Sequence, residues 1–233
     1  MPDGLSDCEA TPHYFGHRDR LRERLLERGA ESLADYELME LVLFAAIPRR
    51  DVKPLAKQLI DRFGSFADAI AAPPERLKQF KWLTGKGVAQ LKIVEAAAVR
   101  LAKTRVIGKT ALSSWNALLD YCAAAMARAT EEQFRVLFLD RKNVLIQDKV
   151  MNRGTVDHAP VYPREIVKLA LELSASALIL VHNHPSGDPT PSRADIEMTR
   201  EVVEAARALR IAVHDHIVIG RNGTASFKAL GLL

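Results

Sequence analysis

Residues 177–195 read ALILVHNHPSGDPTPSRAD, and this stretch decides the class of fold. The run at 177–181 is short and apolar, which is typical of a buried strand. The loop at 185–191 is rich in Pro, Gly and Ser, and it leads into a helix predicted from Ser192 to about Leu209. Residues 211–219 alternate like a second strand. A strand, a helix and a strand in this order predict a layered α/β domain.

The sequence before this stretch also contains both predicted strands and predicted helices. Two apolar, β-branched runs at 134–139 and 144–150 predict a β-hairpin. Pro163 suits the first turn of a helix that runs to about Leu173. A further helix, capped by Ser113 or Ser114, is predicted through Ala127. We therefore expect an α/β domain over residues 111–233.

The first half of the chain is instead predicted to be mostly helical. Apolar side chains recur at helical spacing, and Ser32 and Gly64 suit a helix start and a helix end. Gly85-Lys86-Gly87 is predicted to be a turn, and the polar stretch 103–114 a linker. We expect a helical domain over 1–105, with segments at Asp19–Arg28, Ser32–Ala46, Asp51–Phe63 and Val88–Lys103.

Composition excludes several classes of protein. Hydrophobic residues make up 48% of the 233 residues and charged residues 27%, as in a globular protein with a buried core. The longest apolar runs are far shorter than the roughly 20 residues of a membrane helix. Met1–Gly4 has no basic, apolar pattern of a secretory signal. Two cysteines, Cys8 and Cys122, make neither a disulfide framework nor a four-thiolate zinc site, so we expect a cytoplasmic protein.

Positive charge is concentrated between Ala71 and Thr110. Nine basic and two acidic residues give this block +7, whereas the whole chain carries +4. A basic block of this kind attracts phosphate backbones, which makes nucleic acid a candidate partner. The alternative is an ordinary solvated helix face.

The histidines of residues 177–195 suggest a metal site. His182 and His184 are two apart, so a strand places them on one face, and the loop can return Asp195 to the same point. Two nitrogens and one oxygen leave a tetrahedral Zn²⁺ one position for water, which zinc acidifies into a nucleophile. The alternatives are structural or exposed histidines, and a Ser192-x-x-Asp195 pair that only caps a helix.

Several motifs resemble known families. The pattern of His182, His184 and Asp195 resembles the JAMM metalloprotease motif of MPN-type domains. The sequences PREIV at 163–167, HNHPSG at 182–187 and DHIV at 215–218 resemble the bacterial RadC family, whose members are named as DNA repair proteins. This resemblance covers nearly the whole chain, and its zinc motif is its most specific part.

The resemblance implies roles for individual residues. It implies that His182, His184 and Asp195 bind zinc, and that the Ser192 hydroxyl stabilises an oxyanion. It also implies a carboxylate base on an upstream strand. Strand alternation places Glu132 on the apolar face of the run at 134–139, so Glu132 is the first candidate for that base.

Two other side chains are weighed against these roles. Glu165 competes with Glu132 for the role of base, although an acid after Pro163 also simply complements a helix start. His216 is either a partner of a zinc ligand or a structural histidine, on the face that alternation gives it with His214.

The resemblance also implies that the helical half contains a helix-hairpin-helix, which binds DNA through a Gly-x-Gly turn. Leu83-Thr84-Gly85-Lys86-Gly87 is the candidate. It departs from the usual pattern, because Lys86 stands where an apolar residue is expected. The glycines form either a degenerate hairpin or an ordinary helix–helix turn.

These expectations combine into one hypothesis and two rivals. The first is a JAMM-type metallopeptidase or hydrolase that cleaves peptide or isopeptide bonds with metal-activated water. The rivals are a DNA-binding repair accessory module with a structural metal, and a metal-dependent nuclease. From the sequence we expect Zn²⁺ as the cofactor. The expected partner is a protein or peptide substrate, or a nucleic acid.

Overall fold

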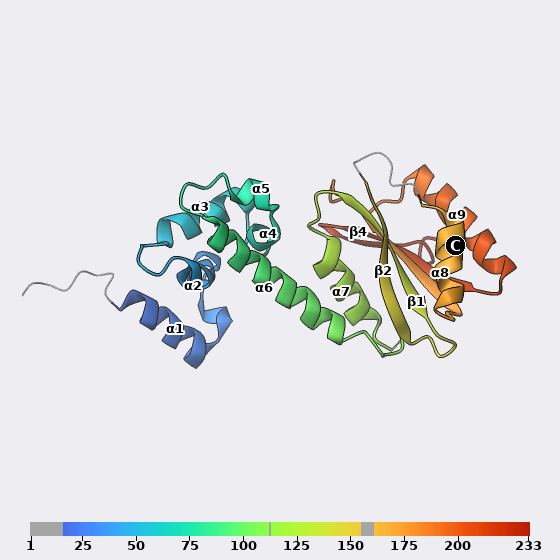
Figure 1. The fold of residues 1–233 in the computed structure, drawn as a ribbon, viewed down its shortest axis with the longest axis horizontal. Coiled ribbons are helices and arrows are strands. Elements are labelled where there is room, and N and C mark those ends of the chain that lie inside the picture. Colours follow the sequence, from blue (N-terminus) through green and yellow to red (C-terminus); the bar gives the residue numbers. More distant parts are fainter. Residues whose placement is uncertain (1–15, 112, 155–160) are drawn as a thin grey trace, which may run out of the picture. The chain divides into compact units, whose positions relative to one another are not determined.

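The computed structural model describes residues 16–111, 113–154 and 161–233. The stretch Met1–Gly4 and Cys8 lie outside these ranges, whereas Cys122 is a buried free thiol. The chain forms two compact units, Met1–Glu95 and Ala96–Leu233 (Figure 1). None of the helices in the described ranges combines the length and apolarity needed to cross a bilayer.

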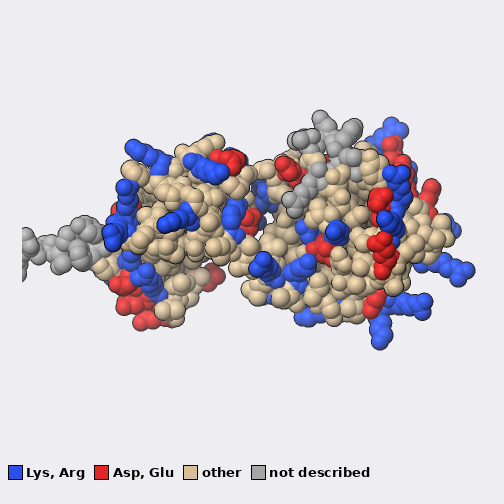
Figure 2. Space-filling model, in the orientation of Figure 1, with Lys and Arg blue, Asp and Glu red and all other residues tan. Residues whose placement is uncertain are grey.

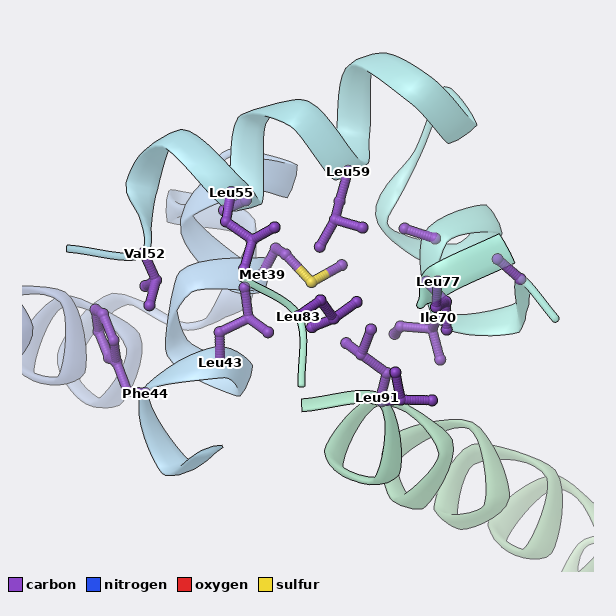
Figure 3. Packing of buried hydrophobic residues seen from close by; sticks show 14 of the residues in the cluster. Met39, Leu43, Phe44, Val52, Leu55, Leu59, Ile70, Leu77, Leu83 and Leu91 are labelled. Atoms are coloured by element: carbon purple, nitrogen blue, oxygen red, sulfur yellow. The ribbon is translucent and has the colours of Figure 1, made fainter. Parts of the chain in front are cut away.

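The first unit consists of helices packed around one apolar core. Met39, Leu43 and Leu59 are fully buried, and their side chains point toward Leu77 and Leu91 (Figure 3). The helices are α1 (His17–Arg28), the short 3-10 turn η1 (Ala30–Ser32), α2 (Asp35–Ala46), α3 (Lys53–Phe63), α4 (Phe66–Ala71), α5 (Pro74–Leu77) and α6 (Gly85–Thr104), which continues into the second unit.

Two local predictions for this unit are wrong. Helix α2 begins at Asp35 rather than at Ser32, because the Glu37 carboxylate accepts a hydrogen bond from the Ala34 backbone N–H at 3.0 Å. Gly85 and Gly87 do not form a turn but lie in the first turn of α6. Gly87 packs so closely on Leu83 that a Cβ there would collide with it. Gly64 does end α3, with a left-handed φ of 95°.

The second unit is an α/β domain, which confirms the predicted fold class. Its mixed sheet has the order β2-β1-β3-β4-β5, with β3 parallel to β4 and the other neighbouring pairs antiparallel. The predicted hairpin is β1 with β2. The strands are β1 (Glu132–Leu139), β2 (Leu145–Gly154), β3 (Ala177–Asn183), β4 (Ala212–Gly220) and β5 (Gly223–Ser226).

Helices cover both faces of this sheet (Figure 1). Helix α7 (Trp115–Met126) packs on one face, against side chains such as Leu137 and Ile179. Helices α8 (Pro163–Glu172) and α9 (Arg193–Ala208) pack on the other face, against Val136 and Leu180. Strand β3 is therefore buried on both faces, which explains its uninterrupted apolar sequence.

The segment predicted as a linker is hydrogen-bonded to the sheet. The Leu145 backbone N–H donates to the Lys109 carbonyl at 3.1 Å, and the Ala111 N–H donates to the Asn143 carbonyl at 2.8 Å. Val106 is buried beside this segment. These residues thus extend the edge of the sheet at the start of β2.

A bulge in β4 corrects the predicted position of His214. Leu178 pairs with Val213 and Ile179 with Asp215, so His214 is an extra residue between them. His214 lines a cavity together with Trp115 of α7. It therefore lies on the α7 side of the sheet, whereas His216 lies on the other side.

Candidate metal centre

The end of β3 and the loop after it position the two histidines. His182 belongs to β3, and the His184 backbone N–H still donates to the Ile219 carbonyl of β4 at 2.9 Å. The loop then turns at Gly187, whose φ of 93° favours glycine. Gly220 lies against that turn, and a Cβ on it would collide with the Gly187 carbonyl. The loop packs against β4 at this point and then leads to the start of α9, where Asp195 lies.

The three predicted ligands meet at one point. The two Nε2 atoms of His182 and His184 are 2.9 Å apart. Asp195 Oδ1 lies 3.3 Å from His182 Nε2, and Asp195 Oδ2 lies 3.4 Å from His184 Nε2. Tetrahedral zinc with bonds of about 2.0–2.1 Å separates its ligand atoms by about 3.3–3.4 Å. The two distances to Asp195 match this value and the distance between the histidines is shorter, so the three side chains are close enough to hold one metal ion between them.

The hydrogen bond at the far side of the His184 ring supports the same conclusion. His184 Nδ1 lies 2.8 Å from the Asp188 carbonyl, which only accepts, so Nδ1 carries the proton. In the neutral ring, Nε2 then presents a lone pair to His182 and Asp195. A lone pair beside a carboxylate is an arrangement that a cation stabilises.

The pKa shifts of Asp195 and His184 show that this cluster favours a positive charge beside the carboxylate. Burial raises the pKa of the Asp195 carboxyl, but the hydrogen bonds from His182, His184 and Ser192 outweigh burial and hold it well below its usual range. The hydrogen bond to Asp195 raises the pKa of His184. A metal ion that binds here therefore competes with the proton of His184.

Ser192 is the N-cap of α9. Its hydroxyl oxygen accepts the Asp195 backbone N–H at 3.2 Å, and Asp195 Oδ2 accepts the Ser192 N–H at 2.7 Å. This reciprocal capping box fixes the Asp195 carboxylate at the helix start. The cap uses the oxygen of the exposed hydroxyl as an acceptor, and a hydrogen bond from the same side chain also lowers the pKa of the Asp195 carboxyl.

We predict that Ser192→Ala lowers the free energy of unfolding by about 1 kcal/mol, because it removes this cap. Urea denaturation with a chelator present measures the effect apart from metal binding. Ser186→Ala, in the same loop, is the matched control and should change stability less. Equal stability of the two variants would show that the cap contributes nothing.

Glu132 lies beside the histidines. It begins β1 two residues before Phe134, which pairs with His182 across the sheet. The same face of β1 therefore brings the half-buried Glu132 next to the end of β3. Its charge contributes to the raised pKa of His184, after the larger effects of Asp195 and the Asp188 carbonyl.

Glu165, the rival candidate for the base, is placed differently. It lies in the first turn of α8, its side chain is 52% exposed, and its carboxylate is 3.5 Å from Arg164 Nε. Within the described part of the chain, no hydrogen bond or ion pair joins Glu165 to the three converging side chains. Glu132 therefore stays the predicted base, with Glu165 as the rival prediction.

Asn183 has a role at this site that the sequence reasoning missed. Its side-chain oxygen accepts the Gln133 backbone N–H at 2.9 Å, and its Nδ2 donates to the Glu131 carbonyl at 3.2 Å. These two bonds hold the backbone on either side of Glu132. Asn183 is fully buried between the two histidines, and its position between them was the only available signal.

Comparison with known sequences identifies the family of this chain. Residues 112–232 match the family described as the RadC-like JAB domain, and residues 14–94 match the family described as UPF0758 N-terminal. A "UPF0758 protein" of Rhodobacter capsulatus is 64% identical over 213 residues, which cover 91% of this chain and all of that relative. The resemblance to RadC proteins is confirmed, and the chain belongs to the RadC-like JAB-domain family.

Proposed function

We propose that the protein is a zinc-dependent hydrolase of peptide or isopeptide bonds, of the JAMM type. The observation that carries this proposal is the convergence of His182, His184 and Asp195, with ligand-atom distances of 2.9, 3.3 and 3.4 Å. Two imidazoles and a carboxylate are a ligand set that suits a catalytic zinc, because they leave a coordination position open. JAB domains are typically metal-dependent, which supports the choice.

The surrounding residues have complementary roles in the proposed reaction. Bound zinc would acidify water and polarise a carbonyl group. Glu132 takes the proton of the attacking water and delivers it to the leaving nitrogen. The Ser192 hydroxyl donates a hydrogen bond to the oxyanion that develops on the carbonyl oxygen. Asn183 keeps the backbone around Glu132 in register with β3.

The proposal is tested on the full-length protein with a peptide library, isopeptide-linked substrates and single-stranded DNA. We expect amide cleavage that stops with a chelator and returns with Zn²⁺. Cleavage of DNA alone would establish the nuclease instead. Bound zinc without cleavage of any substrate would contradict hydrolysis and leave a structural metal.

A second candidate function, nucleic-acid binding, is favoured by an aromatic and basic cluster in the first unit. Trp82 is 52% exposed, with the Arg50 guanidinium 4.2 Å and the Lys81 ammonium 5.1 Å from its ring centre. An exposed ring flanked by cations suits the stacking of an unpaired base. Lys86 lies nearby in sequence, in the first turn of α6.

The rest of the basic block is partly neutralised. Lys78 pairs with Glu75, Lys92 with Glu95, and Lys103 lies 3.6 Å from an Asp148 oxygen. On the face drawn in Figure 2, Lys and Arg side chains are interspersed with Asp and Glu. The cluster around Trp82 is therefore a better candidate for the contact than the block as a whole.

We predict that Trp82→Ala weakens binding of single-stranded DNA by about 5- to 150-fold, since stacking on one aromatic side chain contributes about 1–3 kcal/mol per base. Fluorescence anisotropy across a salt series measures the affinity, and Lys81→Ala and Lys86→Ala should also flatten its salt dependence. Leu26→Ala, at another exposed apolar residue of this unit, is the control. Equal losses in the Trp82 and Leu26 variants would contradict the assignment.

A further inference from the structure

A buried chain of polar side chains lies behind the candidate metal centre. His182 Nδ1 is 2.8 Å from His216 Nε2, and His216 Nδ1 is 2.6 Å from the Thr199 hydroxyl. The Thr199 hydroxyl is in turn 2.5 Å from the Asp195 backbone carbonyl. The chain therefore starts at one candidate ligand, His182, and ends on the backbone of another, Asp195.

The last acceptor sets the direction of every hydrogen bond in this chain. A carbonyl only accepts, so the single hydroxyl proton of Thr199 is donated to Asp195. Thr199 Oγ1 must then accept from His216, which places the His216 proton on Nδ1. His216 Nε2 consequently has a lone pair and accepts from His182 Nδ1–H. The neutral His182 ring is left with a bare Nε2, the atom that faces His184 and Asp195.

These side chains are buried, so water cannot easily take the place of any partner in the hydrogen-bond chain. His182 and Thr199 are each 1% exposed and His216 is fully buried. The His216 ring stacks on Phe227, with ring centres 4.5 Å apart, and meets the edge of Phe134 at 5.7 Å. Aromatic side chains on two sides thus hold the ring in one orientation.

We infer that His216 and Thr199 are positioning residues, which together hold His182 in the tautomer and orientation that present Nε2 to a metal ion. This inference rests on the proposed metal centre and deepens it. Neither residue is one of the three candidate ligands: His216 acts through His182, and Thr199 acts through His216 and through its bond to the Asp195 backbone carbonyl. Hydrogen bonds of this kind from outside a ligand set typically account for about 10- to 100-fold in metal affinity.

Two substitutions of Thr199 separate positioning from mere packing. Thr199→Val keeps the shape of the side chain and removes the hydroxyl, whereas Thr199→Ser keeps the hydroxyl and removes a methyl group. We expect the valine variant to bind Zn²⁺ and Co²⁺ about 10-fold or more weakly in chelator competition, and the serine variant to stay near the wild-type affinity. A packing role predicts the reverse order, because valine fills the space better.

A third variant and a spectroscopic measurement complete the test. His216→Phe should weaken metal affinity by up to about 100-fold while circular dichroism shows a folded protein. In the wild-type protein without metal, ¹⁵N NMR above neutral pH should show both His182 and His216 protonated at Nδ1. The Thr199→Val protein should lose this single tautomer at His216.

The outcomes distinguish this inference from the proposed function. Wild-type affinity in both Thr199→Val and His216→Phe, or an Nε2-protonated His216, would overturn the positioning role and leave the metal centre standing. If the wild-type protein binds neither ion, the proposed metal centre fails, and the NMR tautomers alone decide whether the hydrogen-bond chain is as described.

Discussion

Replacing His182 with alanine is expected to lower zinc affinity by at least about 100-fold. Four-ligand structural zinc sites gain about 10–16 kcal/mol in total, so each ligand carries several kcal/mol. His182 also connects the metal centre to His216, so its loss removes both a ligand and the hydrogen bond behind it. Elemental analysis of the purified protein and chelator competition measure the effect.

Two further variants make this result interpretable. His184→Ala removes a ligand at the more exposed end of the site and should lose zinc to a similar extent, even if the buried His182→Ala protein folds poorly. His214→Ala changes a histidine on the other side of the sheet, whose Nε2 lies 2.6 Å from Asn143, and should keep its zinc. Zinc retained in both ligand variants would show that these histidines do not hold it.

Replacing Glu132 with glutamine is expected to reduce turnover by about 10²- to 10⁴-fold without loss of zinc, because the amide has the shape of the acid but takes up no proton. The assay uses the best substrate from the peptide library, and zinc content is measured on the same sample. The change should appear in kcat rather than in KM, since the proton transfer belongs to the chemical step.

Glu165→Gln is the matched control for Glu132→Gln. Both are partly exposed carboxylates of the second unit, but Glu165 lies next to Arg164 rather than next to the histidines. We expect the Glu165 variant to keep wild-type turnover. Full turnover in the Glu132 variant together with loss in the Glu165 variant would reverse the assignment of the base.

The parts of the site that the sequence predicts are those that local rules determine. His182 and His184 are neighbours on one strand face, and a single loop joins them to the start of α9. The spacing of two along a strand and the capping pattern at Ser192 are both short-range signals. Sequence reasoning therefore predicts that the three side chains converge, whereas the base on an upstream strand follows from the family resemblance, and Glu132 stays a prediction.

Two residues behind His182 are connected through tertiary packing: Thr199, which sequence reasoning missed, and His216, for which it left two roles open. Thr199 lies in the middle of α9 and His216 in β4, and no periodic pattern predicts that they meet behind His182. The β4 bulge also breaks the alternation from which His214 and His216 were assigned to one face. Likewise, the polar composition of 103–114 does not reveal that Lys109 and Ala111 form hydrogen bonds with the edge of the sheet.

The close approach of Gly220 to Gly187 has a consequence for recognising active relatives. The turn at Gly187 carries the Asp188 carbonyl that orients His184, and that turn has room only because position 220 has no side chain. A relative that keeps both histidines and the aspartate but has a larger residue at 220 would have its loop pushed outward. Such a protein would keep the three candidate ligands but lose their common geometry, so under the proposed function we expect it to bind metal weakly or not at all.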